Sequence, residues 1–151
     1  MTGNPLVYLA ARYSRREELC EYRSELERAG YTITSRWLNG SHQILPNGEP
    51  LGRDQEALIE SGAAPSDVRG QFAAEDWADL LAADTVISFT EPPRSKASRG
   101  GRHVEFGAAL ALNKRCIVVG HRENVFHCLE RVEYFETWDE VLDALVASSP
   151  W

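Results

Sequence analysis

The stretch GGRHVEFGAAL, residues 100–110, decides how the rest of the chain is interpreted. Its two glycines leave a polar loop and open an apolar helix, and Glu105 stands in the first turns of that helix. Main-chain N–H groups at a helix N-terminus stabilise negative charge, so we expect Glu105 to stay ionised easily. An ionised carboxylate can act as a nucleophile. The alternative interpretation is a glutamate that only complements the helix dipole.

Composition places the chain among ordinary globular proteins. Its 151 residues predict a single domain over 1–151, and 43% hydrophobic residues are enough for a sizeable core. The net charge of -7 argues against nucleic acid or a membrane surface as a partner. The N-terminus shows no signal-peptide pattern, and no apolar run is long enough to cross a bilayer. We therefore expect a cytoplasmic protein.

Short buried strands alternate with amphipathic helices along the chain. We expect strands at 6–11, 31–38, 85–89, 115–120 and 132–135, and helices starting near 14, 66, 100 and 137. The segments 14–17 and 137–140 have the spacing of a capping box. Residues 39–64 are rich in Gly, Pro and Asn and predict either a long loop or a partly helical excursion, of the kind that often covers a site.

This alternation predicts parallel βαβ units. Five such strands favour a doubly wound α/β fold of the flavodoxin or Rossmann-like kind, with strand order 2-1-3-4-5 and helices on both faces. In such a sheet, ligands bind at the carboxyl ends of the strands, here between the first and the third. The loops that meet there carry residues 12–16 and 90–105, so we expect a group of arginines and Glu105 to share one crevice.

The helix over 66–82 brings a second carboxylate toward this crevice. Its inward stripe consists of residues spaced by four, namely Val68, Phe72, Asp76 and Leu80. A carboxylate at such a position needs a reason, although Asp76 could also be solvated at the edge of the stripe. Glu75 and Asp79 lie further round the helix, and we expect both to be solvated.

Several common chemistries have no support in the sequence. The chain has no phosphate-binding Walker loop, no dinucleotide-binding G-x-G-x-x-G after the first strand and no G-x-S-x-G nucleophile elbow. Its four histidines show no metal-ligand spacing, and its three cysteines, Cys20, Cys116 and Cys128, fit neither a zinc site nor a disulfide framework. We expect neither a metal nor a cofactor.

Three motifs together resemble the nucleoside 2-deoxyribosyltransferases and the related nucleoside 5'-monophosphate N-glycosidases, over most of the chain. They are Tyr8-Leu9-Ala10 at the end of the first strand, Asp76 eight residues before Asp84, and the G-x-x-x-E-F-G-x-A pattern at 101–109 that contains Glu105. The resemblance implies that Glu105 attacks the anomeric carbon of a nucleoside. It also implies that Asp76 handles the proton of the departing base and that Tyr8 steadies the glutamate.

The chemistry of the bond agrees with this resemblance. Breaking an N-glycosidic bond develops positive charge on the sugar and negative charge on the base, so the reaction needs an ionised carboxylate and a proton donor. Glycoside cleavage with two carboxylates and a covalent intermediate follows the same logic, by analogy because the leaving atom here is nitrogen. Two carboxylates in different environments can hold different protonation states.

One departure from the family pattern concerns the substrate. The transferases commonly carry an aspartate six residues before the nucleophile, where this chain has Arg99 next to Ser98. Gly100 and Gly101 at the helix start, with arginines and Ser14 in the loop after the first strand, favour an anion in the crevice. We therefore expect a nucleoside 5'-monophosphate as substrate and water as acceptor, with Arg12 and Arg99 as direct contacts. The alternative reaction is base exchange between free nucleosides. The alternative role for the arginines is that they are simply solvated.

The sequence also bears on the oligomeric state and on two competing functions. In the family a neighbouring subunit completes the pocket, so we expect a homodimer or higher homo-oligomer, with Asn124 as the candidate contributed residue; an ordinary turn residue is the alternative. A non-catalytic nucleotide-binding or sensing module is the competing function, and the presence of both Asp76 and Glu105 favours the enzyme. A phosphoribohydrolase is disfavoured because no Gly-Thr step lies between Gly101 and Glu105.

Overall fold

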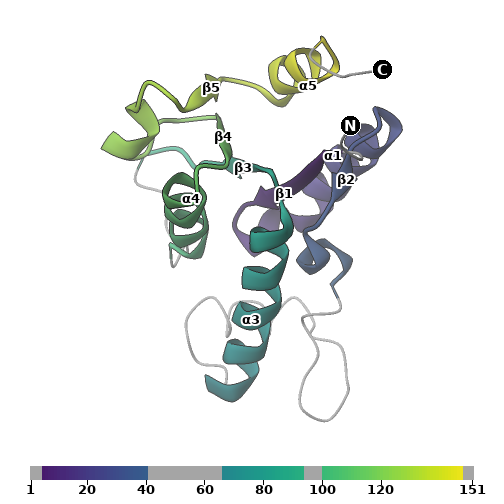
Figure 1. Cartoon of the computed structure of the whole chain (residues 1–151), viewed down its shortest axis with the longest axis vertical. Coiled ribbons are helices and arrows are strands. Elements are labelled where there is room, and N and C mark those ends of the chain that lie inside the picture. The colour runs from purple at the N-terminus through teal and green to yellow at the C-terminus, as the bar shows by residue number, and fades with distance from the viewer. Residues whose placement is uncertain (1–4, 41–65, 94–99, 148–151) are drawn as a thin grey trace.

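Five parallel strands form one sheet in the order β2-β1-β3-β4-β5, as the sequence predicted (Figure 1). The computed structural model describes residues 5–40, 66–93 and 100–147. The strands are β1 (Leu6–Ala10), β2 (Thr32–Ile33), β3 (Thr85–Phe89), β4 (Arg115–Val119) and β5 (Glu133–Phe135). The central strands β1, β3 and β4 are almost entirely buried, which agrees with their continuous apolar runs.

Helices cover both faces of the sheet. They are α1 (Arg16–Arg28), α3 (Ser66–Ala82), α4 (Gly101–Ala111) and α5 (Trp138–Ala147), with short 3-10 turns η1 (Tyr13–Arg15), η2 (Arg36–Asn39) and η3 (Val125–Cys128). Tyr22 of α1 and Trp138 of α5 stack on each other and lie against Phe89 of β3, so α1 and α5 share one face. Val86 lies three residues before Phe89 in β3, so its side chain points to the other face of the sheet. Tyr8 is the register partner of Val86 in β1 and points to that same face. That face belongs to α3 and α4.

The second strand is much shorter than the predicted 31–38, because side chains replace its ladder of main-chain hydrogen bonds. The N–H of Leu9 donates to Oγ of Ser35 (2.6 Å), and the carbonyl of Leu9 accepts from the indole Nε1 of Trp37 (2.9 Å). The chain turns into η2 at this point, where the N–H and Nε of Arg36 donate to the carboxylate of Asp79 at 3.0 and 2.8 Å. The expectation that Asp79 is solvated was therefore wrong: it is buried and ion-paired.

The two predicted capping boxes behave differently. At the start of α5, the N–H of Glu140 donates to Oγ1 of Thr137 (3.3 Å), as predicted. At the start of α1, the turn η1 comes first, the helix begins at Arg16, and no side chain caps its N-terminus. The predicted cap from Ser14 was wrong because that residue lies inside η1 and is exposed.

The loops after β3 and β4 are locked together at the carboxyl edge of the sheet. Oγ1 of Thr90 donates to the carbonyl of Val119 (3.1 Å) and accepts from the N–H of His121 (2.6 Å). Gly120 lies between these two residues with φ of +112°, and a Cβ there would stand 2.9 Å from Oγ1 of Thr90. This position requires glycine both for its backbone conformation and for its space.

We predict that Gly120→Ala destabilises the fold by about 1–3 kcal/mol, because alanine meets a strained φ and the Thr90 hydroxyl. Gly107→Ala is the matched control, since Gly107 lies in α4 and, in the described part of the chain, no atom beyond its helix backbone and its chain neighbours lies within 4 Å of an added Cβ. Urea unfolding of both variants measures the difference. A Gly120→Ala protein as stable as Gly107→Ala would contradict the prediction.

Candidate active site

A hydrogen bond between Tyr8 and Glu105 joins the central strand β1 to helix α4. Oη of Tyr8, whose residue is 1% exposed, donates to Oε2 of the Glu105 carboxyl group. The strand register places Tyr8 opposite Val86, beneath the face that α4 covers. The structure thus brings together two of the three residues that the sequence proposed as catalytic, although they are 97 positions apart in the chain.

Burial sets the protonation of Glu105. It raises the pKa of Glu105 to about 8, and the negative charge of Asp76 adds to the rise, while the hydrogen bond from Tyr8 opposes it. The expectation of an easily ionised Glu105 was therefore wrong for the free protein. The helix dipole acts mainly within the first turn, and Glu105 is the fifth residue of α4, so the dipole does not offset the loss of hydration.

Asp76 belongs to the same electrostatic cluster. It lies on α3, is half-buried, and its charge raises the pKa of both Tyr8 and Glu105. Burial is the largest cause of the raised pKa of Tyr8. Two carboxylates and a phenol that influence one another in a water-poor place can share protons unequally, which is the property that acid–base chemistry needs.

The arginines of the loop after β1 are paired with carboxylates. Nη1 of Arg12 lies 3.4 Å from Oε1 of Glu91, and Nη1 of Arg15 lies 3.2 Å from Oε2 of the same residue. Arg15 also makes two hydrogen bonds to Glu18, at 2.9 and 2.7 Å. Arg16 turns elsewhere and donates to the carbonyl of Leu38 (2.8 Å). Arg12 and Arg15 thus lie together against Glu91, a carboxylate partner that the sequence did not predict, while Arg16 does not join them.

A buried ion pair anchors the start of α4. Arg102, with a side chain 3% exposed, donates to Glu123 through Nη1 (2.6 Å) and Nη2 (3.0 Å). Oε1 of Glu123 also accepts from the N–H of Glu91 (3.0 Å), and the N–H of Glu123 donates to Nδ1 of His127 (3.0 Å). Sequence reasoning missed this group because its members come from helix α4 and from the segments that follow β3 and β4. The sequence did carry one signal of this ion pair, because Arg102 is a charged residue within an apolar helix pattern.

The other residues proposed to bind substrate lie partly at the carboxyl edge of the sheet and partly outside the described residues. Gly100 precedes α4 in the left-handed region, with φ of +80°, and Gly101 is the first helical residue, so both lie at the carboxyl edge as expected. Ser14 is exposed at the start of the segment after β1. Ser98 and Arg99 lie outside the described residues, as does most of the predicted loop over 39–64.

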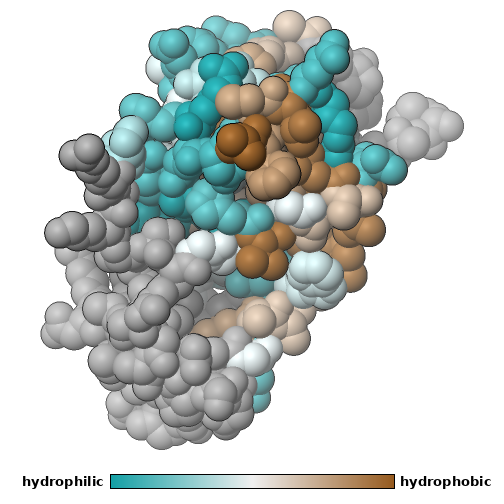
Figure 2. All heavy atoms as spheres, turned by 90° about the vertical axis from the view of Figure 1, so that its left-hand side faces the viewer, coloured by the Kyte–Doolittle hydropathy of each residue, from teal (hydrophilic) through white to brown (hydrophobic). Residues whose placement is uncertain are grey.

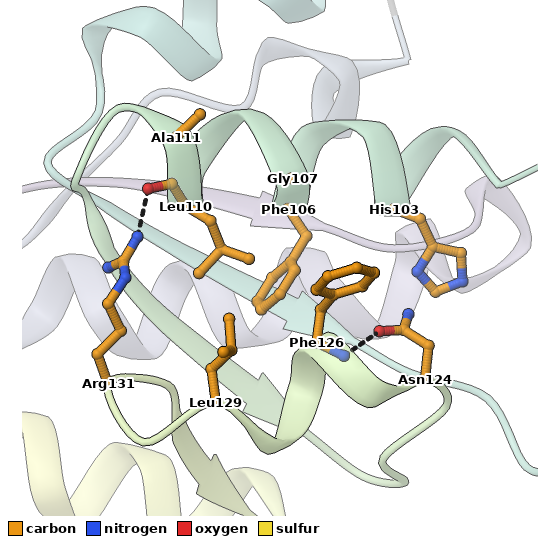
Figure 3. Close-up of a pocket in the computed structure, with 9 residues that line it drawn as sticks. All are labelled: His103, Phe106, Gly107, Leu110, Ala111, Asn124, Phe126, Leu129 and Arg131. Atoms are coloured by element: carbon orange, nitrogen blue, oxygen red, sulfur yellow. Dashed lines mark hydrogen bonds between the residues drawn. The ribbon is translucent and has the colours of Figure 1, made fainter.

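Asn124 lies apart from the Tyr8–Glu105 pair, in an apolar groove between α4 and η3. Its Oδ1 accepts from the N–H of Phe126 (2.9 Å), so Asn124 caps the turn η3 (Figure 3). The groove encloses about 790 Å³ and is lined by His103, Phe106, Gly107, Leu110, Ala111, Asn124, Phe126, Leu129 and Arg131. Apolar side chains gather on the face of the molecule shown in Figure 2, and Phe126 is 60% exposed. The groove uses the flank of α4 that does not carry Glu105.

Within 5–40, 66–93 and 100–147, no group of His, Cys, Asp and Glu side chains is arranged to hold a metal ion. Among the helices in those ranges, none has the length and apolar character needed to span a membrane.

Comparisons with known proteins identify the fold. No protein-family model and no curated protein matches the chain. A solved 2-deoxyribosyltransferase from Bacillus psychrosaccharolyticus superposes with a TM-score of 0.63 at 18% identity, covering 93% of this chain and 95% of that one. The CMP N-glycosidase BcmB of Clostridium botulinum superposes with a TM-score of 0.55 at 19% identity, covering 95% and 99%. The chain has the fold of these two enzymes.

We predict that Glu105 titrates with a pKa of about 8 and that Tyr8→Phe raises this pKa further, because the lost hydrogen bond stabilises the carboxylate. Asp76→Asn should lower it, since the opposing negative charge disappears. Carboxyl carbon NMR of selectively labelled protein, compared with a Glu105→Gln sample for assignment, measures all three values. A Glu105 pKa near 4.5 in the wild type, or one that Tyr8→Phe lowers, would rule out this account.

Proposed function

We propose that the protein cleaves the N-glycosidic bond of a nucleoside or its 5'-monophosphate through a glycosyl-enzyme formed on Glu105. The observation that carries the proposal is the cluster of Tyr8, Asp76 and Glu105 on the face of the sheet that α3 and α4 cover. The fold that this chain shares with a 2-deoxyribosyltransferase and a CMP N-glycosidase supports the same reaction class.

The proposed reaction has two steps that share one proton. Glu105 must first lose the proton that burial holds on it, and Asp76 is the neighbouring carboxylate that can receive it. In the first step, the ionised Glu105 forms a bond to the anomeric carbon while the bond to the base nitrogen breaks and Asp76 protonates the base. In the second, water attacks the same carbon, gives its proton to Asp76 and releases Glu105. Tyr8 donates its hydrogen bond to Glu105 whenever that carboxylate is charged.

For the substrate, we propose a 5'-monophosphate with water as acceptor. Gly100 and Gly101 place the N-terminus of α4 at the carboxyl edge, and Arg12 lies at the same edge after β1. Both features suit a phosphate group, and Ser14, Ser98 and Arg99 remain proposed contacts. A second free base in the assay separates hydrolysis from base transfer, since only a transferase would convert it into a new nucleoside.

Self-association is part of the proposal. The apolar groove beside α4 and its exposed Phe126 suit contact with a second copy of the chain, which would bring Asn124 of one copy toward the other. A homodimer or larger homo-oligomer is thus proposed, with sedimentation velocity as its measurement.

We predict that Glu105→Gln lowers turnover on the best substrate by a factor on the order of 10³ or more, because glutamine cannot hold the glycosyl group. Assays of base release from a panel of nucleosides and 5'-monophosphates measure the loss. Glu133→Gln is the matched control, since Glu133 pairs with Arg115 at 2.6 Å at the opposite, amino-terminal end of β4. Normal turnover by Glu105→Gln would rule out a glycosyl-enzyme on Glu105, and a wild type that binds nucleotides without releasing any base would favour the non-catalytic binding module.

We also predict that Asp76→Asn slows cleavage by about 10²-fold for bases that leave poorly without a proton, and much less for activated bases. The reason is that asparagine cannot deliver the proton that a poor leaving group needs. Rates for a series of bases with different leaving ability give the comparison. Equal slowing across the series would show that Asp76 is not the general acid.

A further inference from the structure

Glu91 occupies the arginines that the proposed phosphate would need. Its side chain is 10% exposed and lies between the two guanidinium groups, 3.4 Å from Arg12 and 3.2 Å from Arg15. The Arg15 side chain also donates to the carbonyl of Thr90 (3.2 Å), directly before Glu91. The carboxylate thus stands where loops after β1 and β3 meet, which is the switch point of the sheet.

The charges of this group balance. Arg15 is held by Glu18 as well as by Glu91, so the two arginines face two carboxylates. In the described part of the chain, Nη1 of Arg12 donates to Glu91, and the Nε of Arg12 is buried with no acceptor there. Arg12 is therefore the less satisfied of the two guanidinium groups, and a buried donor without a partner favours an incoming acceptor.

The main chain at Glu91 is held by hydrogen bonds that do not involve its own carboxylate. The N–H of Glu91 donates to Oε1 of Glu123, which the buried Arg102 fixes in turn. Thr90 is held by Val119 and by the loop after β4. A change of side-chain rotamer at Glu91 would therefore free Arg12 without disturbing the loop that carries it.

We propose that Glu91 is a specificity-determining residue that competes with the phosphate of a substrate for Arg12. A phosphate dianion and the Glu91 carboxylate cannot share the same donors at low cost, because like charges at this distance repel. Glu91 thereby weakens the protein's affinity for any 5'-phosphate. It also reduces the ratio of the affinity for a monophosphate to the affinity for the matching nucleoside. This inference rests on the proposed function for the identity of the ligand, but it concerns binding rather than turnover.

The experiment compares Glu91→Gln with the wild type in binding calorimetry, using inorganic phosphate, a nucleoside 5'-monophosphate and the matching nucleoside. Glutamine keeps the shape of the side chain and removes its charge. Glu133→Gln is the matched control, because it removes the same charge from a pair with Arg115 far from the switch point. Glu91→Asp is the second variant, in which a shorter side chain keeps the charge but withdraws it from Arg12.

We expect Glu91→Gln to bind inorganic phosphate and the monophosphate about three- to tenfold more tightly, with no change for the nucleoside. Glu91→Asp should shift affinity in the same direction by less, and Glu133→Gln should not shift it. In an Arg12→Gln background, the gain from Glu91→Gln should disappear. Unchanged or weaker phosphate binding by Glu91→Gln, no measurable phosphate binding by any variant, or an equal gain in Glu133→Gln would overturn the proposal.

The binding result and the proposed reaction can fail separately. If Glu91→Gln gains phosphate affinity while no variant releases a base, the competition stands and the N-glycosidic function falls. If base release occurs but phosphate affinity ignores Glu91, the function stands and this inference falls.

Discussion

The hydrogen bond from Tyr8 to Glu105 connects the centre of the sheet to the helix that carries the candidate nucleophile. It depends on two facts of packing: Tyr8 points to the α3 and α4 face of β1, and α4 runs across that face. The same packing removes water from Glu105 and raises its pKa to about 8. A carboxyl group placed this way keeps a proton near neutral pH, and its chemistry depends on where that proton goes when substrate arrives.

The carboxyl edge of the sheet is organised by a second constraint, the pairing of charges between loops. Glu91 faces Arg12 and Arg15, while Glu123 accepts from the N–H of Glu91 and pairs with Arg102. Arg12, Arg15 and Arg102 each thus have a carboxylate partner, which offsets the cost of desolvating a charge. In these pairs the charges offset one another, and the affinity of Arg12 and Arg15 for an anion depends on how readily a carboxylate gives way.

Much of the fold could be predicted from local patterns. The helix over 66–82, the strand over 85–89 and the sheet order follow from hydrophobic periodicity and the rules for parallel connections. The bounds of β2 were mispredicted because side chains replace main-chain hydrogen bonds there. Ser35 and Trp37 satisfy Leu9, so β2 ends after Ile33. No periodicity reports such an exchange, because it depends on residues from another element.

The sequence by itself determined the fold class and the strand order, because spacing and topology are local or rule-bound properties. Only the tertiary structure decided the protonation of Glu105 and the partners of Arg12. Hydration and charge pairing depend on the three-dimensional distances between groups far apart in the chain: Tyr8 and Glu105 are 97 residues apart, and Arg12 and Glu91 are 79 apart. A guanidinium that the sequence presents as available for a phosphate is, in the fold, already held by a carboxylate.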